Sequence, residues 1–258
     1  MSNGFTTNSL KDTLRFPFQG EGWEGRFLVG AGLILGSFIV PIIPALLAAG
    51  YILLVFRQAI AGEELALPAW SDWGKLFTDG LRWFVVVLVY SGPGTLVLVG
   101  GYAAYFAATF LPLFLAGNGS EAVGLGVLFG MACLFIGLFV GMLLLFLGTI
   151  PLPIASAHFV AKDRVGAAFR VREWWAIGRA NGFGFLVAWV VTLGLYSLYG
   201  FAAALLYYSC VLCVLVPFVG AAAGFYLGLV TAALFGQAYR EGVQALEAKQ
   251  DAASEEAA

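Results

Sequence analysis

The chain has 258 residues, of which 61% are hydrophobic and only 11% are charged, and its mean hydropathy is +0.93. A soluble domain of this size keeps about a quarter of its surface wet and has too little core to hide so much apolar surface. The net charge of -2 argues against a nucleic-acid partner, because phosphate backbones bind basic patches. The composition therefore indicates an integral membrane protein.

The chain is expected to form one membrane domain over residues 20–244, between a polar tail at 1–19 and a flexible tail at 245–258. A helix needs about 20 apolar residues to cross a bilayer, and no alternation typical of barrel strands is present, so we expect an all-α protein. Each of five apolar runs is long enough for a crossing. They cover residues 27–56, 84–116, 122–150, 183–208 and 211–239.

The placement of lysine and arginine predicts the topology. The basic residues fall in four groups: the N-terminal tail up to Arg26, residues 57–82, residues 162–179, and the C-terminal tail from Arg240. The connections near 117–121 and 209–213 contain none. Basic loops stay on the cytoplasmic side, so both termini are predicted to be cytoplasmic, in the cell membrane. The last four runs then make two out-and-back hairpins.

The first run must then enter the membrane and return on the same side. Pro41 and Pro44 interrupt it near its middle, and proline breaks a helix. We expect a short or re-entrant hairpin, Phe27–Val40 followed by Ala45–Phe56, which brings the total to about six membrane helices. Re-entrant backbone must be buried against protein. The alternative is one long span with the N-terminal tail outside.

Two stretches between the runs have the pattern of amphipathic, tryptophan-bearing helices that lie in the headgroup plane. They are Pro68–Gly80 and Gly166–Asn181. Each is expected to anchor the protein at the cytoplasmic surface, or to dock a partner or an anionic headgroup. The candidate residues for recognition and anchoring are Trp70, Asp72, Trp73, Phe77, Asp79, Arg82, Arg170, Arg172, Trp174, Trp175, Arg179 and Arg240.

The charged members of this set predict a surface network. Asp72, Asp79 and Glu173 share the cytoplasmic side with a larger number of arginines. We expect ion pairs that tie the amphipathic segments to the ends of the spans, with the surplus arginines available to phospholipid headgroups. The arginines concerned are Arg57, Arg82, Arg170, Arg172, Arg179 and Arg240.

Three motifs carry a family resemblance. Phe16-Pro17-Phe18 stands ahead of Trp23, the segment 62–81 contains Trp-x-Asp-Trp-x-x-Leu-Phe-x-Asp-Gly, and Phe235–Arg240 closes the last run. With these motifs, the chain from about Arg15 to Glu241 resembles the multi-pass membrane family known as domain of unknown function 4013. Members are similar to the membrane part of some glycerophosphodiester phosphodiesterases, whose chemistry belongs to a separate soluble domain. The resemblance implies no catalytic residues.

No constellation for catalysis, metal or cofactor binding stands out, so we expect no enzyme activity, no metal and no cofactor. Ionisable residues are missing from the middle of the runs, where they usually mark ion pathways. His158 stands alone as a potential zinc ligand, and Cys210 and Cys213 have redox spacing but lie among apolar residues. Buried small hydrophobic side chains are the default interpretation of these cysteines.

Small residues spaced four apart, such as Gly137 with Gly141 and Gly220 with Gly224, predict close helix packing. They are expected to pack the chain's own bundle, with self-association as the alternative. The preferred function is a structural or accessory membrane protein that contacts lipid, or an unidentified protein partner, through its cytoplasmic interfacial helices. The alternative is a transporter or channel for an uncharged or lipidic substrate.

Overall fold

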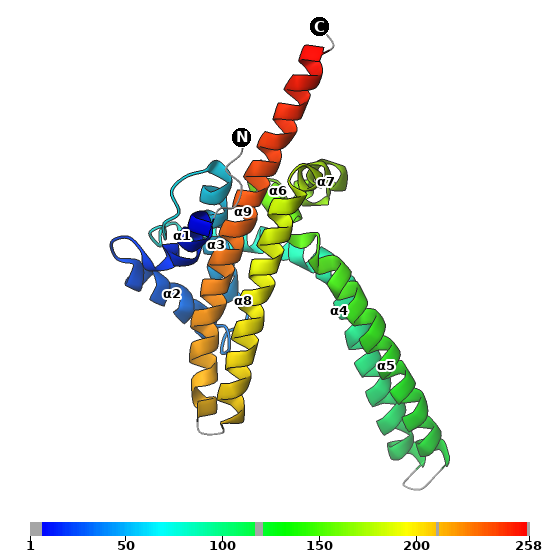
Figure 1. Ribbon diagram of the computed structural model, residues 1–258. Coiled ribbons are helices and arrows are strands. Elements are labelled where there is room, and N and C mark those ends of the chain that lie inside the picture. The colour runs from blue at the N-terminus through cyan, green and yellow to red at the C-terminus, as the bar shows by residue number, and fades with distance from the viewer. Residues whose placement is uncertain (1–6, 117–120, 210–211, 257–258) are drawn as a thin grey trace. The chain divides into compact units, whose positions relative to one another are not determined.

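The computed structural model describes residues 7–116, 121–209 and 212–256, and every regular element in these ranges is a helix (Figure 1). The all-α prediction is confirmed. The elements are α1 (Thr7–Arg15), η1 (Phe16–Phe18), α2 (Trp23–Gly36), α3 (Ile43–Ala61), α4 (Trp73–Ala116), α5 (Glu121–Thr149), α6 (Leu152–Lys162), η2 (Val165–Phe169), α7 (Val171–Ala180), α8 (Gly182–Tyr208), η3 (Leu212–Leu215) and α9 (Val216–Glu256).

The chain divides into two compact units. Unit 1 comprises Met1–Phe84 and Pro153–Ala258, and unit 2 comprises Val85–Leu152. Helix α4 begins in unit 1 and continues into unit 2. Residues of both expected tails are helical, since α1 lies within 1–19 and α9 extends to Glu256. The predicted boundaries of the membrane domain stay a prediction.

Unit 2 is a pair of long helices, α4 and α5, that pack through glycines. A Cβ atom added to Gly101 would lie 2.8 Å from the Cα of Gly137, and one added to Gly137 would lie 2.7 Å from the Cα of Gly101. Both separations are too short for any side chain, so the two backbones touch directly. Gly141 continues the stripe against Leu98 of α4. The predicted small-residue packing within the chain is therefore found here.

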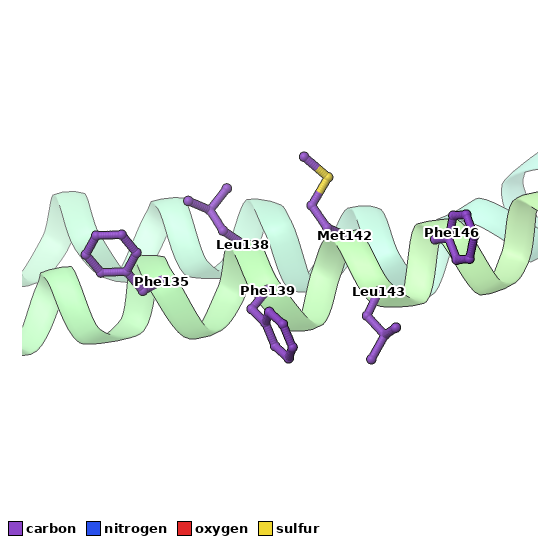
Figure 2. Close-up of a pocket in the computed structure, with 6 residues that line it drawn as sticks. All are labelled: Phe135, Leu138, Phe139, Met142, Leu143 and Phe146. Atoms are coloured by element: carbon purple, nitrogen blue, oxygen red, sulfur yellow. The ribbon is translucent and has the colours of Figure 1, made fainter. Parts of the chain in front are cut away.

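The other side of α5 carries large apolar side chains. Phe135 and Phe139 are 62% and 74% exposed. With their neighbours they surround a surface hollow of about 510 Å³, and Figure 2 shows these side chains spreading outward from α5. The lining residues are Phe135, Leu138, Phe139, Met142, Leu143 and Phe146. An apolar surface of this kind suits contact with lipid chains, because the bilayer core is as apolar as the side chains.

Unit 1 is built around α9, which packs against α2, α3, α7 and α8 (Figure 1). Its apolar face supplies the largest part of the core, where Phe225, Leu229 and Leu234 have no exposed surface. Helix α3 also lies close to the first turns of α4. A Cβ atom at Gly50 would fall on the carbonyl group of Leu76, so only glycine permits this backbone contact.

The first apolar run is interrupted where the prolines predicted it. Helix α2 ends at Gly36, α3 begins at Ile43, and the two helices pack against each other. Trp70 of the segment after α3 donates a hydrogen bond from Nε1 to the carbonyl oxygen of Arg26 in the first turn of α2, at 2.8 Å. The same indole stacks on Tyr51, so the start of α2 lies near the middle of α3, and α3 continues beyond this level to Ala61.

Five helical segments within the described residues are long and apolar enough to cross a membrane. They are Ile43–Ala61, Trp73–Leu115, Val123–Thr149, Gly182–Tyr208 and Leu212–Glu255. The chain is thus a multi-pass transmembrane protein. Helix α2 has 14 residues, or about 21 Å at 1.5 Å per residue, and is not among them. The count of six membrane helices stays a prediction.

The two segments expected to be amphipathic helices differ from each other. Residues 63–72 are not helical, and α4 begins only at Trp73, so the expected separate helix over Pro68–Gly80 is wrong. Asp72 ends the non-helical stretch with a φ of 50° and accepts a hydrogen bond from the backbone N–H of Lys75 at 3.1 Å. This N-cap starts α4 at the next residue. Over Gly166–Asn181 the short helices η2 and α7 are present.

Candidate functional site

Among the described residues of unit 1, the side chains that form ion pairs make two clusters. The Asp79 cluster consists of Arg57, Asp79, Arg82 and Asp163. The Asp79 side chain is only 3% exposed, and its Oδ2 accepts a hydrogen bond of 2.7 Å from Nη1 of Arg57. Arg82 lies 3.8 Å from the other carboxylate oxygen, and both arginines also approach Asp163. This cluster joins α3, the start of α4 and the segment after α6.

The His158 cluster joins α6, α7 and α9. His158 is buried, and its ring nitrogens lie 2.7 Å from the Tyr239 hydroxyl and 3.1 Å from Oε2 of Glu173. Arg170 donates a hydrogen bond of 3.1 Å to the other oxygen of Glu173. The hydrogen bond from His158 lowers the pKa of Glu173, and Arg170 lowers it further. Such a chain of contacts holds α7 against the core.

An aromatic stack holds the non-helical segment before α4. The ring of Trp70 stacks on that of Tyr51 with centroids 3.9 Å apart, and the ring of Trp73 stacks on that of Trp70 with centroids 5.4 Å apart. The Tyr51 hydroxyl donates to the carbonyl oxygen of Pro68 at 2.7 Å, and Arg26 donates to that of Leu67 at 2.6 Å. Trp70 is therefore a packing residue, while Trp73 remains 46% exposed.

A groove of about 370 Å³ runs between α7 and the polar end of α9. We call it the α7–α9 groove. Its lining includes three basic side chains and no acidic one: the residues are Arg172, Trp175, Ala176, Arg179, Ala180, Leu246 and Lys249. The guanidinium of Arg179 lies 5.4 Å from the centre of the Trp175 ring, a cation–π contact. Trp175 is 51% exposed, whereas its neighbour Trp174 is buried and donates to the carbonyl oxygen of Ala168.

The predicted network is therefore divided into separate groups. Asp79 pairs with Arg57 and Arg82, and Glu173 pairs with Arg170, as expected. The other charged candidates lie outside these pairs, and Phe77 is half-buried. Asp72 caps α4, Arg172 and Arg179 line the α7–α9 groove, and Arg240 extends beside Gly62.

Sequence reasoning missed the partners that are far apart in the chain. Glu173 is 15 residues from His158, and Tyr239 is 81 residues away from it. Along the chain, the acid nearest to His158 is Asp163, so the sequence alone shows His158 as an isolated side chain. The Phe235–Arg240 motif contained Tyr239, but the motif indicated only a family.

Metal and cysteine sites gain no support from the geometry. Among the described residues, no group of three or more His, Cys, Asp or Glu side chains could hold a metal ion. Of the two cysteines with redox spacing, Cys210 lies outside the described residues and Cys213 is half-buried.

Comparison with protein families decides the affiliation of the chain. The family model of "Protein of unknown function (DUF4013)" matches residues 33–208. The chain belongs to the DUF4013 family. No curated protein and no solved structure matches it. Membership agrees with the resemblance drawn from the motifs, and the family's description assigns no function to any residue.

The DUF4013 match covers the segment 62–81 but not the other two motifs, since Phe16–Phe18 and Phe235–Arg240 lie outside residues 33–208. Both of these motifs nevertheless contribute a side chain to the core of unit 1, where Phe16 is 2% and Phe235 is 1% exposed. The matched region includes all of α7, with Trp175 and Arg179, but not the part of α9 that completes the α7–α9 groove.

Proposed function

We propose that this DUF4013 chain is a non-catalytic accessory membrane protein that contacts lipid or a partner protein through the polar end of unit 1. The proposal rests on one observation: some arginine side chains are paired with carboxylates and others are not. Arg57 and Arg82 lie against carboxylates, whereas within the described residues Arg172 and Arg179 form no ion pair. Cations exposed beside Trp175 are available to a ligand outside the chain.

The proposed membrane arrangement has six segments, with α2 and α3 as a re-entrant hairpin. Three features support it: the packing of α2 against α3, the short length of α2, and the exposed apolar turn between the helices. An apolar turn belongs in the bilayer interior and not in water. The exposed large side chains of the turn are Phe38, Ile39, Val40, Ile42 and Ile43.

The orientation follows from the same charges. The Asp79 cluster, the His158 cluster and the α7–α9 groove contain most of the arginines of the chain, and the positive-inside rule assigns such a surface to the cytoplasm. Helix α7 is proposed to lie in the interface there. No catalytic role is proposed for His158, since this buried residue lines neither of the two cavities described above.

The proposal is tested by purifying the full chain in mild detergent and quantifying the lipids and proteins that accompany it. We expect one lipid class or one protein to be enriched over its abundance in the membrane. Replacement of Trp175 by Ala on α7 should remove this enrichment, and replacement of Phe139, another exposed aromatic residue, by Ala on α5 should not.

A lipid composition equal to that of the membrane, with no stoichiometric protein, would contradict the accessory role. Equal losses in the two variants would contradict the assignment of contact to the polar end of unit 1. Saturable flux of an uncharged solute into proteoliposomes containing the purified chain would favour the transporter alternative.

A further inference from the structure

One wall of the α7–α9 groove is formed by regularly spaced side chains of α7. Arg172, Trp175 and Arg179 are spaced three and four residues apart, so they form one stripe along α7. The opposite face of α7 is buried through Trp174 and Ile177. Helix α7 is thus held in place by its apolar face, and its basic, tryptophan-bearing face is directed into the groove.

Helix α9 supplies the other wall. Leu246 and Lys249 are three residues apart and face the same groove. Small side chains on α7, those of Ala176 and Ala180, leave room between the walls. The site therefore combines three positive charges, one exposed indole and a few apolar atoms in about 370 Å³.

The groove also lies at a defined depth relative to the apolar spans. Asn181 follows α7 directly, caps α8 by accepting from the N–H of Gly184, and donates to the carbonyl oxygen of Ala238 and to Glu241 of α9. The end of α7, the start of the apolar helix α8 and the region of Glu241 are therefore at one level.

Lys249 lies eight residues beyond Glu241, or about 12 Å along the helix axis at 1.5 Å per residue. Its side chain points back toward the N-terminal end of α9, as helical side chains do, and hence toward the membrane. The headgroup layer is roughly 5–8 Å thick on each side of the bilayer. The basic groups of the groove are thus within reach of lipid phosphates.

We propose that the α7–α9 groove binds the phosphate group of an anionic glycerophospholipid of the surrounding membrane. The inference rests on the proposed function and names its ligand class. Arg172, Arg179 and Lys249 contact the phosphate oxygens, for which arginine offers a forked set of donors. The Trp175 ring and Leu246 contact the glycerol and the first part of the acyl chains, since indole prefers the interface between water and hydrocarbon.

A membrane lipid fits these observations better than an acidic protein. The groove lies close to the level at which the apolar helix α8 starts, its aromatic side chain is half exposed, and its volume suits one headgroup. A lipid ligand is also present at high local concentration wherever α7 meets the bilayer.

The test is native mass spectrometry of the full-length protein in detergent with added phosphatidylglycerol or phosphatidylcholine. Wild-type protein should bind phosphatidylglycerol more tightly. In the triple variant Arg172→Gln, Arg179→Gln, Lys249→Gln this preference should fall about ten- to a hundredfold, because each substitution removes one charged contact with the phosphate. The matched control Lys11→Gln, Lys75→Gln, Lys162→Gln removes the same charge from exposed positions elsewhere in unit 1 and should keep the preference.

Equal binding of the two lipids by the wild type, or equal losses in the two triple variants, would overturn the proposal. Binding of a polyglutamate peptide that depends on the three groove residues, with no preference for phosphatidylglycerol, would assign the groove to an acidic protein and also overturn it. Enrichment of a companion that depends on Trp175, together with a lipid preference insensitive to the groove charges, would overturn only this inference and leave the accessory function standing.

Discussion

Two aspartates at the start of α4 have opposite surroundings. The Asp79 side chain is 3% exposed and pairs with Arg57, whose side chain is 26% exposed, while Asp72 is exposed and caps the helix. Asp79→Asn leaves the Arg57 guanidinium beside a neutral amide in a position that is largely shielded from solvent. We expect it to destabilise the protein by about 1–3 kcal/mol, less than for a fully buried pair because Arg57 reaches solvent.

The measurement is the thermal unfolding midpoint of the purified protein in detergent. Asp72→Asn is the matched control, and since Asn caps helices as well as Asp does, its midpoint should stay near that of the wild type. A midpoint for Asp79→Asn equal to that of the control would show that the Asp79 cluster contributes no stability.

The contact of Glu173 with His158 and Arg170 makes stability depend on pH. Because the pKa of Glu173 is lowered in the folded protein, its stabilising effect is complete above the usual glutamate pKa of about 4.3 and is lost as the pH falls through the folded-state value. We expect Glu173→Gln to reduce the fall in unfolding midpoint between pH 6 and pH 3. Glu247→Gln is the control at an exposed position of α9, and its unfolding midpoint should fall with pH as that of the wild type does. Identical midpoint curves for all three proteins would contradict the prediction.

At the scale of elements, the long helices could be predicted and the short ones could not. The run 183–208 became α8, Gly182–Tyr208, because the length of an apolar run directly reports a membrane helix. Pro41 located the break between α2 and α3 correctly. The segment Pro68–Gly80 was predicted wrongly because periodicity cannot detect that Asp72 caps a helix that starts only at Trp73.

The candidate site was predictable in part, for a related reason. The basic stripe of α7 is local and was visible in the sequence. Its second wall, Leu246 and Lys249, lies on α9, in a region expected to be a flexible tail. Contacts such as that between His158 and Tyr239 depend on tertiary packing, which a single sequence does not reveal.

Within unit 2, adjacent glycines of α4 provide a test of helix packing. A Cβ atom at Gly101 would lie 2.8 Å from backbone of α5, whereas one at Gly100 would meet nothing within 4 Å. We expect Gly101→Ala to force α4 and α5 apart and destabilise the protein by about 1–3 kcal/mol. Gly100→Ala should be neutral or raise stability by up to about 1 kcal/mol through helix propensity. Thermal unfolding in detergent compares them, and equal midpoints would rule out close backbone packing at this position.

At the scale of the whole molecule, the parity of crossings decides the topology. The five apolar spans alone would place the two termini on opposite sides. If α2 and α3 together form a re-entrant hairpin, the termini share one side, and every basic cluster faces the cytoplasm as the positive-inside rule requires. The packing of α2 against α3 supports the hairpin, because consecutive helices joined by the short segment 37–42 lie side by side.

We therefore expect reporters fused to the N-terminus and to the C-terminus to be cytoplasmic in intact cells. A cysteine introduced at Ile39, an apolar residue of the exposed turn that is 85% exposed, should resist a membrane-impermeant maleimide added from either side, because the turn lies in hydrocarbon. A cysteine at Lys75, at the exposed start of α4, is the positive control and should react from the cytoplasmic side only. A reporter found outside the cell at the N-terminus, or labelling at position 39 from either aqueous side, would contradict the re-entrant hairpin. This part of the chain would then be assigned a complete crossing.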